Sequence, residues 1–461
     1  MAKRYVIFIV IAMALLIVAI SSTSVSVAFP EITSYFNVSL ILAGWVLDVA
    51  QLAGTIIMPL AGKAGDVFGA KKLFLIATAT FTIGSLASSF APNIGLLIVS
   101  RFIQELGAGA FLPLATSIII DYFPDHRQQA IGLFSSIFPI GMIIGPNIGG
   151  WLVETFRWQS VFWLNIPLGA AVFIFALTML KPKQNRGGKL DLAGSGLLAG
   201  TLSTLLVGLS IIGSSRDRVS WIIFLVAIAV CGTFFFLFLR HERRAKDPII
   251  DLAVIKQKPF QAANYFNLIY GAAVLGVMGY VPLLARSIFG MSTLASGLIM
   301  TPRSVGQMVS SFFTSMSLPK WGYRWPMLIG TSLGALTLVL LGIQASGLHL
   351  GSWSLISPFL LGSILFIAGV GSGIAAPAAN NACIELMPNR VATITGVRGM
   401  FRQSGSAVSI AITAMVLENF KYTVGFQIMF FGLAAGLLFS LPFIFAMPKS
   451  ANDSCPPDVS K

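Results

Sequence analysis

Ionisable side chains inside long apolar stretches are the residues of this sequence best suited to chemistry. Asp48 and Glu105 are two such acids, and Arg101 precedes Glu105 by four residues. Residues four apart share one helix face, so Arg101 and Glu105 can pair directly. A rise of 1.5 Å per residue places both acids roughly 12–16 Å from one helix end, near the middle of a bilayer. Charge is costly there, which makes each residue a functional candidate.

Two interpretations of the pair follow from its chemistry. Pairing favours the charged carboxylate of Glu105, whereas burial favours the protonated one. A conformational change that separates Glu105 from Arg101 would therefore let Glu105, together with Asp48, take up and release a proton. Alternatively, the ion pair is permanent and only offsets the cost of burying Arg101.

A run of small residues predicts a second kind of function, movement at a helix seam. Gly141, Gly145 and Gly149 are spaced four apart, and Gly150 follows directly. Glycines at this spacing let helices approach closely in lipid. Pro146 removes one backbone hydrogen bond and bends the helix. We expect a bent, closely packed helix that seals two parts of the molecule as they move.

Residue patterns typical of enzymes and metal sites are absent. The three cysteines, Cys231, Cys383 and Cys455, form no CxxC pair. The histidines, expected in loops, have no HExxH-like spacing, and no GxxxxGK[ST] motif is present. We therefore expect no metal, no cofactor and no enzymatic activity. A membrane enzyme or a channel remains a minor alternative.

The elements that must position these residues are membrane helices. Of 461 residues, 56% are hydrophobic and 10% are charged, and the mean hydropathy is +0.87. Soluble globular chains carry about 25% charged residues. A bilayer-spanning helix needs about 20 apolar residues. Fourteen stretches qualify: 5–29, 40–61, 71–90, 94–121, 129–152, 160–180, 191–212, 220–239, 262–285, 293–316, 325–345, 353–383, 392–418 and 424–446.

The basic residues indicate how these stretches are oriented. Of the 30 Lys and Arg residues, 21 fall in the alternate connections that include the N-terminal segment, 5 in the others, and 4 within the stretches. Cytoplasmic loops carry an excess of Lys and Arg. We therefore expect both termini to be cytoplasmic and the protein to lie in the cell membrane. The formal charge of +14 reflects this bias and predicts no nucleic-acid partner.

An internal repeat indicates two halves of six helices in parallel orientation. At an offset of 264 residues, Pro113 matches Pro377 and Asp121 matches Glu385. We expect an N-terminal half at 1–180, two additional helices with linkers at 181–258, a C-terminal half at 259–446, and a tail at 447–461. The matched glycines, in the same register, are Gly107 with Gly371, Gly109 with Gly373, Gly132 with Gly396, and Gly141 with Gly405.

With these features the chain resembles the major facilitator superfamily, and within it the fourteen-span drug/proton antiporter family of the quaternary-ammonium and multidrug efflux type. The run from Gly141 to Gly150 resembles the GxxxGPxxGG motif of exporters. Arg101 and Gln104 match an R-x-x-Q-G pattern, whose arginine the resemblance implicates in proton coupling. Asp48 matches an acid of the quaternary-ammonium branch. The usual aspartate of the first span is replaced by Ser21.

The segment between the second and third stretches resembles a gating loop of the superfamily. Its glycines would allow a tight turn. An acid of this loop is stabilised beside a helix N-terminus, by roughly 0.3–1 kcal/mol. The residues that carry the resemblance are Gly62, Asp66, Gly69, Lys71 and Lys72.

The resemblance implies a substrate cavity at the midplane between the halves. Three arginines, Arg303, Arg398 and Arg402, lie within stretches of the C-terminal half. Each either contacts substrate or satisfies backbone carbonyls. Other candidates to line the cavity are Gln104, Phe138, Asn264, Asn267 and Tyr270.

The sequence as a whole predicts a proton-coupled exporter of amphiphilic small molecules or drugs that works by alternating access. The expected partners are a small amphiphilic substrate, protons and membrane lipids, and we expect a monomer. A lipid or anionic metabolite exporter on the same fold is the alternative, favoured by four arginines against two acids within the stretches.

Overall fold

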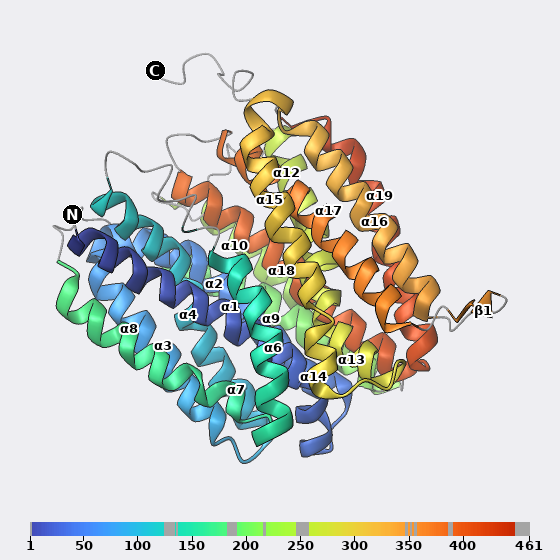
Figure 1. Cartoon of the computed structure of the whole chain (residues 1–461). Coiled ribbons are helices and arrows are strands. Elements are labelled where there is room, and N and C mark those ends of the chain that lie inside the picture. Colours follow the sequence, from blue (N-terminus) through green and yellow to red (C-terminus); the bar gives the residue numbers. More distant parts are fainter. Residues whose placement is uncertain are drawn as a thin grey trace.

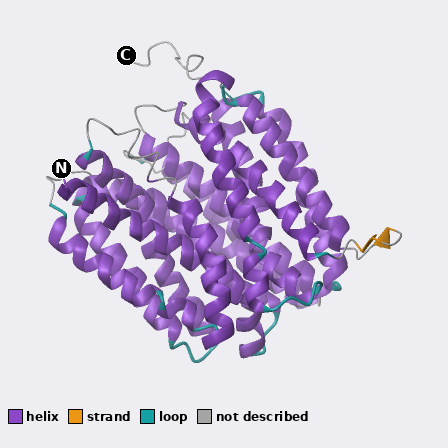
Figure 2. Cartoon of the chain, viewed as in Figure 1, coloured by secondary structure: helices purple, strands orange, loops and turns teal. Residues whose placement is uncertain are grey.

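A computed structural model of the chain describes residues 2–123, 134, 137–181, 191–214, 218–245, 258–345, 349–350, 353–354, 357–385 and 391–447. Nearly all of these residues are helical (Figure 2). Two short strands, β1 (His349–Leu350) and β2 (Trp353–Ser354), pair antiparallel beyond the helices. The expected all-helical architecture is confirmed apart from this small hairpin.

The helices form one bundle in which the two ends of the sequence occupy different sides (Figure 1). The N-terminal group comprises α1 (Ala2–Phe36), α2 (Leu40–Phe68), α3 (Ala70–Ser89), α4 (Ile94–Tyr122), α6 (Ile137–Phe156), α7 (Ser160–Trp163) and α8 (Asn165–Met179). Between the groups come α9 (Leu192–Ser214) and α10 (Arg218–Glu242). The C-terminal group comprises α12 (Lys258–Tyr270), η2 (Gly271–Gly276), η3 (Val277–Tyr280), α13 (Val281–Ser287), α14 (Thr293–Leu298), α15 (Thr301–Trp321), α16 (Arg324–Ala345), α17 (Pro358–Glu385), α18 (Val391–Asn419) and α19 (Tyr422–Ile444).

Eleven helices of the described ranges are long and apolar enough to cross a membrane. The helices that fall outside this set include α6, α9 and α15. The apolar stretch of α9 found among the described residues is Ala193–Leu209, and α15 carries Arg303, Gln307 and several serines. The structure therefore supports a multi-pass membrane protein, and the eleven helices that qualify among the described residues do not confirm the fourteen spans expected from the sequence.

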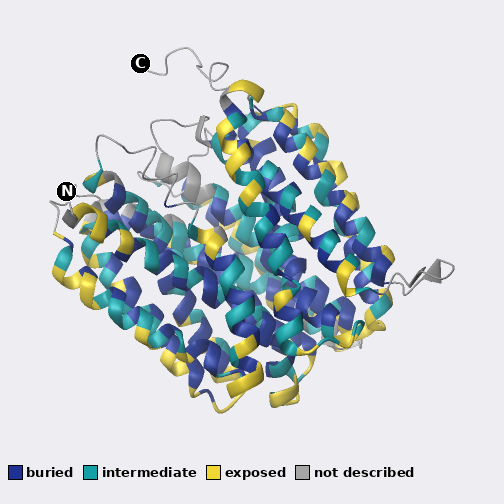
Figure 3. Ribbon diagram, in the orientation of Figure 1, coloured by how far each residue is buried: buried dark blue, intermediate teal, exposed yellow. Residues whose placement is uncertain are grey.

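Burial differs sharply among the spanning helices. In the most apolar stretch of α2, 67% of the residues are buried, whereas in that of α10 only 6% are buried. Figure 3 shows buried residues on the inward faces of the bundle and exposed ones around it. Helix α10 packs mainly against α9. The exposed apolar side chains of α10, such as Trp221 and Phe236, are thus suited to contact lipid.

The internal repeat reappears as equivalent packing. Members of each glycine pair that the structure describes approach corresponding helices of the two groups. Small residues allow such approaches because no Cβ separates the backbones. The pairs are Gly107 against α3 and Gly371 against α16, Gly109 against α2 and Gly373 against α15, and Gly141 against α1 and Gly405 against α12 and η2.

Several helix ends differ from the sequence expectation. Helix α17 begins at Pro358 and not at residue 353, because the residue before a proline is biased away from helix and proline suits the first turn. His241, expected in a loop, lies in the last turn of α10. His349 belongs to β1, and His126 lies outside the described residues.

Candidate functional site

The predicted ion pair of α4 is formed. Arg101 Nη1 lies 2.7 Å from Glu105 Oε1, and the arginine is 1% exposed. The same nitrogen donates to Gln104 Oε1 at 2.6 Å. The guanidinium lies 5.8 Å from the ring centroid of Phe162, close enough for a cation–π contact. The positive charge of Arg101 is thus compensated within its own group of helices.

A hydrogen-bond network continues from this pair through three further helices. Gln104 Nε2 donates to Ser85 Oγ at 2.7 Å and to Ser21 Oγ at 3.3 Å. Asn165 Nδ2 donates to Ser21 Oγ at 2.9 Å. Ser21, which replaces the usual aspartate, therefore joins α1 to α4 and α8. Gln104, expected to line the substrate cavity, is fully buried in this network.

Asp48 lies in a different environment from Glu105. It is 2% exposed, and its Oδ1 atom has no hydrogen-bond partner among the described residues. One turn earlier on α2, a Cβ at Gly44 would lie 3.1 Å from the hydroxyl of Tyr280 of η3, which donates to the Ile410 carbonyl at 3.4 Å. Asp48 thus lies where α2 meets the C-terminal group. No hydrogen bond or ion pair in the described part of the chain joins Asp48 to Glu105.

The expected gating loop is almost entirely helical. Helix α2 continues through Gly62 to Phe68, and Gly69 alone separates it from α3. Gly69 has φ = 91°, a value that glycine tolerates and other residues rarely adopt. The prediction of a loop was wrong because one glycine is sufficient for the turn. The side chain of Asp66 lies outside the described atoms.

The basic residues of this segment have separate positions. Lys71 Nζ donates to the carbonyls of Leu177, at 3.0 Å, and Leu180, at the C-terminus of α8. Carbonyls at a helix C-terminus lack intrahelical donors, so a lysine is well placed there. Lys72 is exposed. Lys71 therefore connects α3 to α8 within the N-terminal group.

The glycine run of α6 lies between the two groups of helices. A Cβ at Gly149 would lie 2.7 Å from Ser24 Cβ of α1, and Gly141 and Gly145 approach α1 equally closely. On the other side, a Cβ at Gly150 would lie 3.0 Å from Leu294 Cα of α14. Helix α6 is consequently held between α1 and the C-terminal group.

Polar contacts reinforce the side of α6 that faces the C-terminal group. Asn147 Nδ2 donates to Thr301 Oγ1 at 2.8 Å, and Ser304 Oγ donates to the Met142 carbonyl at 3.0 Å. Pro146 lies inside the continuous helix α6, and its carbonyl lies against Gly297. The motif seen in the sequence therefore forms the seam between the two groups.

Two glutamates join the groups at one end of the bundle, the end where α1 ends and α2 begins. We call this end the closed end. Glu154 Oε2, at the end of α6, accepts from Leu294 N of α14 at 2.8 Å. Glu418 Oε2, at the end of α18, accepts from Leu40 N of α2 at 2.9 Å. Each carboxylate satisfies a backbone N–H that the first turn of a helix leaves free.

These two contacts are related by the internal repeat. Residues 154 and 418 are separated by the same 264 residues as the other matched pairs. The helix that each glutamate caps also has its own serine N-cap, Ser292 for α14 and Ser39 for α2. Glu31 adds a looser ion pair, 3.8 Å from Arg286.

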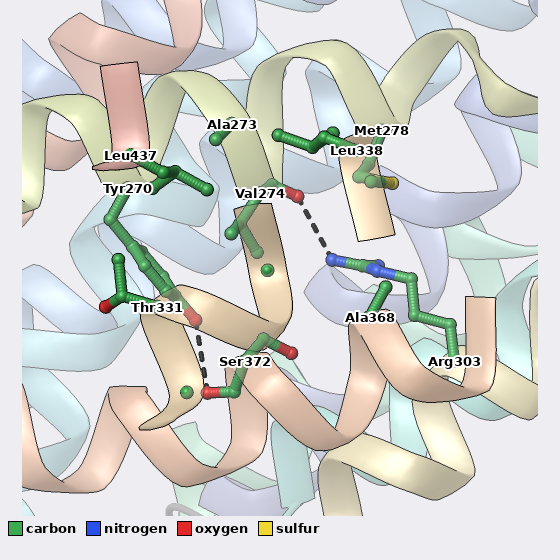
Figure 4. A pocket seen from close by; sticks show the side chains of 12 residues that line it. Tyr270, Ala273, Val274, Met278, Arg303, Thr331, Leu338, Ala368, Ser372 and Leu437 are labelled. Carbon is green, nitrogen blue, oxygen red and sulfur yellow. Dashed lines mark hydrogen bonds between the residues drawn. The ribbon is translucent and has the colours of Figure 1, made fainter. Parts of the chain in front are cut away.

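A cavity lies inside the C-terminal group, among η2, α15, α16, α17 and α19. Tyr270 and Arg303, both predicted site residues, line it (Figure 4). Arg303 Nη2 donates to the Val274 carbonyl at 3.0 Å, and the Tyr270 hydroxyl donates to the Ser372 carbonyl at 3.2 Å. The structure thus brings part of the predicted site together within one group and not between the two.

The remaining arginines of the prediction lie close to this cavity. The Arg402 carbonyl lies against Gly271, which follows Tyr270 in the chain, and Arg398 lies one turn before Arg402 on α18. The Nε atom of each of Arg303, Arg398 and Arg402 is buried without a hydrogen-bond partner in the described portion of the structure. None of these three arginines takes part in the ion pairs that the described residues form.

Three further predicted residues do not line this cavity. Phe138 is 37% exposed near the start of α6. Asn264 donates to the Phe260 carbonyl of its own helix, at 2.9 Å. Asn267 donates to the Ala263 carbonyl and to Cys383 Sγ. Both asparagines are packed inside the bundle.

Sequence reasoning missed the partners of the predicted residues. Thr331 and Ser372 of the cavity and Tyr280 beside Asp48 carry no local signal, since their roles depend on helix packing. Glu154 and Glu418 did carry a signal in the sequence, the internal repeat. Extending the repeat offset to the ends of the helices would have matched them.

The sequence was compared with known proteins. The sequence model of the family described as "Major Facilitator Superfamily" matches residues 11–410. The chain is 29% identical to "Uncharacterized MFS-type transporter YvkA" of Bacillus subtilis, over 95% of this chain and 96% of that protein. It is 28% identical to "Multidrug transporter protein MdtP" of Bacillus subtilis, over 90% of this chain and 76% of the relative.

A solved structure has the same arrangement of helices. It is a peptide transporter in complex with sulfate, with a TM-score of 0.68 and 16% sequence identity. The likeness covers 95% of both chains. At this identity the match shows the fold alone.

Proposed function

The chain belongs to the major facilitator superfamily and is a membrane transporter, not an enzyme; from this premise we propose that it exports amphiphilic small molecules or drugs in exchange for protons. Transport proceeds by alternating access, in which two groups of helices rock about a central binding region. The name of the relative MdtP supports drugs as the substrate class.

One observation carries this proposal, the position of α6 between α1 and the C-terminal group. Gly149 contacts α1 while Gly150 contacts α14, so one helix is in close contact on both sides. A seam of this kind can hold one end of the bundle shut while the other end opens. Its resemblance to the exporter motif supports export as the direction of transport.

Proton coupling is assigned to Asp48, Arg101 and Glu105. A carboxylate must alternate between a proton-accepting and a proton-donating environment to couple transport to a gradient. Glu105 has an adjacent cation, and Asp48 faces the opposite group of helices. Rocking of the groups would change the surroundings of both acids.

The test of the function uses cells that lack their own drug exporters. Cells producing the chain are challenged with cationic ethidium, neutral chloramphenicol and anionic nalidixate, and efflux is followed with and without a protonophore. We expect protection against at least one compound and loss of efflux when the proton gradient is collapsed. Protection that survives the protonophore would contradict proton coupling.

A second candidate function is the export of lipids or anionic metabolites on the same fold. The buried arginines of the C-terminal group favour it, because no described carboxylate pairs with Arg303. Efflux of nalidixate without efflux of ethidium would support this alternative.

The proposed topology keeps fourteen spans, with α6, α9 and α15 crossing the membrane in addition to the eleven. The proposed domains are two halves at 1–180 and 259–446, two extra spans at 181–258, and a tail at 447–461. Both termini are assigned to the cytoplasm and the monomer to the cell membrane. The excess of Lys and Arg in alternate connections supports this orientation.

A further inference from the structure

Three arginines of the C-terminal group differ from Arg101 in having no carboxylate partner among the described residues. Arg101 pairs with Glu105, whereas the described ion pairs include none of Arg303, Arg398 and Arg402. Removing an unpaired cation from water is expensive, so charged residues inside a membrane protein normally pair with something. We propose that these three arginines bind an anionic group, such as a carboxylate, sulfonate or phosphate.

Arg303 has hydrogen-bond donors that could bind such a group. A guanidinium carries five N–H donors. The structure gives Arg303 one hydrogen bond, from Nη2 to the Val274 carbonyl, and leaves Nε without a partner among the described residues. Support of a backbone carbonyl therefore accounts for only part of this side chain, which is 4% exposed.

The cavity beside Arg303 offers a second unused polar group. Thr331 is 2% exposed, and its hydroxyl has no hydrogen-bond partner in the described structure. Figure 4 shows Thr331, Tyr270 and Arg303 on the wall of the same cavity. An anionic oxygen accepts from hydroxyl and guanidinium donors alike, and bonds to charged groups are the strong ones.

The backbone around the cluster is packed closely. Gly271, the first residue of the π-helical segment η2, lies against the Arg402 carbonyl, and Gly369 of α17 lies against the Arg303 carbonyl. A side chain at either glycine would displace the helix that carries the arginine. Segments of π-helix frequently occur at functional sites. The arginines are therefore positioned by rigid elements and not by flexible loops.

This inference rests on the proposed transport function and narrows its substrate. The anion is carried by an organic acid, which would make acid-bearing amphiphiles a substrate class, or it is a free inorganic ion. The two sources share one chemistry, and the experiment separates them.

The experiment measures binding by calorimetry to the full-length protein in lipid nanodiscs, without a proton gradient. The probes are naphthalene-2-sulfonate and naphthalene-2-sulfonamide, which share a ring system and differ in charge at neutral pH. We expect the sulfonate to bind and the sulfonamide to bind at least about tenfold more weakly, the equivalent of one lost charged hydrogen bond. Equal binding of the two probes would overturn the proposal without any variant being needed.

Substitutions locate the site. Arg303→Gln and Arg402→Gln should each weaken sulfonate binding about tenfold. Arg303→Lys, which keeps the charge, should weaken it less. Arg243→Gln removes an exposed arginine and should leave binding unchanged. Unchanged sulfonate affinity in folded Arg303→Gln and Arg402→Gln proteins would place the probe elsewhere and refute the site.

Competition with sodium sulfate at constant ionic strength identifies the source of the anion. Displacement of the sulfonate by sulfate indicates an inorganic anion, and lack of displacement indicates an organic acid; either result supports an anion site. Failure of the transport function gives a different outcome, since selective sulfonate binding would persist without efflux. Conversely, efflux together with equal binding of both probes would remove the anion site alone.

Discussion

At the residue scale, the two membrane-embedded acids have different partners and therefore different expected roles. Glu105 is bound to Arg101 in its own helix, whereas Asp48, at the boundary with the C-terminal group, has one oxygen without a hydrogen-bond partner in the part of the chain that the structure describes. A carboxylate that is already paired changes its proton affinity only when the pair separates. Asp48 responds directly to movement of the group it faces.

The first prediction concerns proton coupling by these acids. Glu105→Gln and Asp48→Asn should each abolish proton-driven accumulation in proteoliposomes, because the neutral side chain cannot release a proton. Substrate exchange at equal pH on both sides should continue, since it needs no proton transfer. If the Glu105→Gln protein accumulates substrate like the unaltered protein, the Arg101–Glu105 pair is permanent and only offsets the burial of Arg101.

How much of the site could be predicted follows from how local each interaction is. The Arg101–Glu105 pair was predictable because four residues on one helix fix its geometry. The partners of Gln104, Ser21 and Ser85, were not, because they lie on other helices. Tyr270 and Arg303 were predicted individually, but their meeting at one cavity depends on helix packing.

At the element scale, α6 is the helix whose packing matters most for movement. Its glycines fit α1 on one face, and its polar residues bond α15 on the other. The sequence predicted the close packing from glycine spacing. It could not predict the partner helices, since spacing defines a face and not what covers it.

The second prediction tests this helix. Gly145→Val should leave the protein inserted in the membrane yet reduce transport to background, because the new side chain would overlap Thr23 and the Ile20 carbonyl. Gly432→Val in α19 is the matched control, since no atom lies within 4 Å of a Cβ there. Efflux and membrane abundance are measured for both. Efflux retained by a well-inserted Gly145→Val protein would reduce the motif to ordinary packing.

The third prediction concerns the two glutamate caps of the closed end. Each cap contributes at most about 1 kcal/mol, since both carboxylates are exposed and caps of this type have that magnitude. Together they would favour the closed state by at most about 2 kcal/mol, which is a factor of roughly thirty. Combined Glu154→Ala and Glu418→Ala substitution, which removes both acceptors, should therefore populate a state that is open at this end.

Spin labels at residues 157 and 421, which the repeat relates, report on that opening. In a background without the three native cysteines, the double variant should show a second, longer distance. Each single variant should show it to a smaller extent, because one cap remains. An unchanged distance distribution in the double variant would mean that the glutamates do not hold this end together.

At the scale of the whole molecule, the extra helices join the two groups. Leu206 of α9 packs with Leu52 of α2 and Ala407 of α18, so α9 contacts both groups at once. Helix α10 covers the outer side of α9 and exposes most of its own surface. This arrangement fits a pair of membrane-crossing helices beside the moving parts.

The number of spans was the least predictable part of the fold. Apolar length identifies a span only where the helix faces lipid. Helix α15 is rich in serine and carries Arg303, because part of its surface faces the interior of the bundle. Helix α9 packs between α2 and α18, so little of its surface on that side can face lipid. Hydropathy alone therefore cannot decide whether these helices cross the membrane.

The fourth prediction tests whether α9 and α10 cross the membrane. Single cysteines are placed at residues 185, 216 and 257, before, between and after the two helices, in a background without native cysteines. If both helices cross, a membrane-impermeant maleimide should label residue 216 in intact cells and the other two only after permeabilisation. This outcome follows from Lys and Arg residues flanking 185 and 257, where the positive-inside bias applies. In the unaltered protein, the charges of Arg216 and Arg218 oppose placing this connection outside the cell. Insertion of the strongly apolar helix α10 into the membrane outweighs that cost. Labelling of all three positions from the same side would make α9 and α10 a pair that does not cross, and the fourteen-span topology would have to be abandoned.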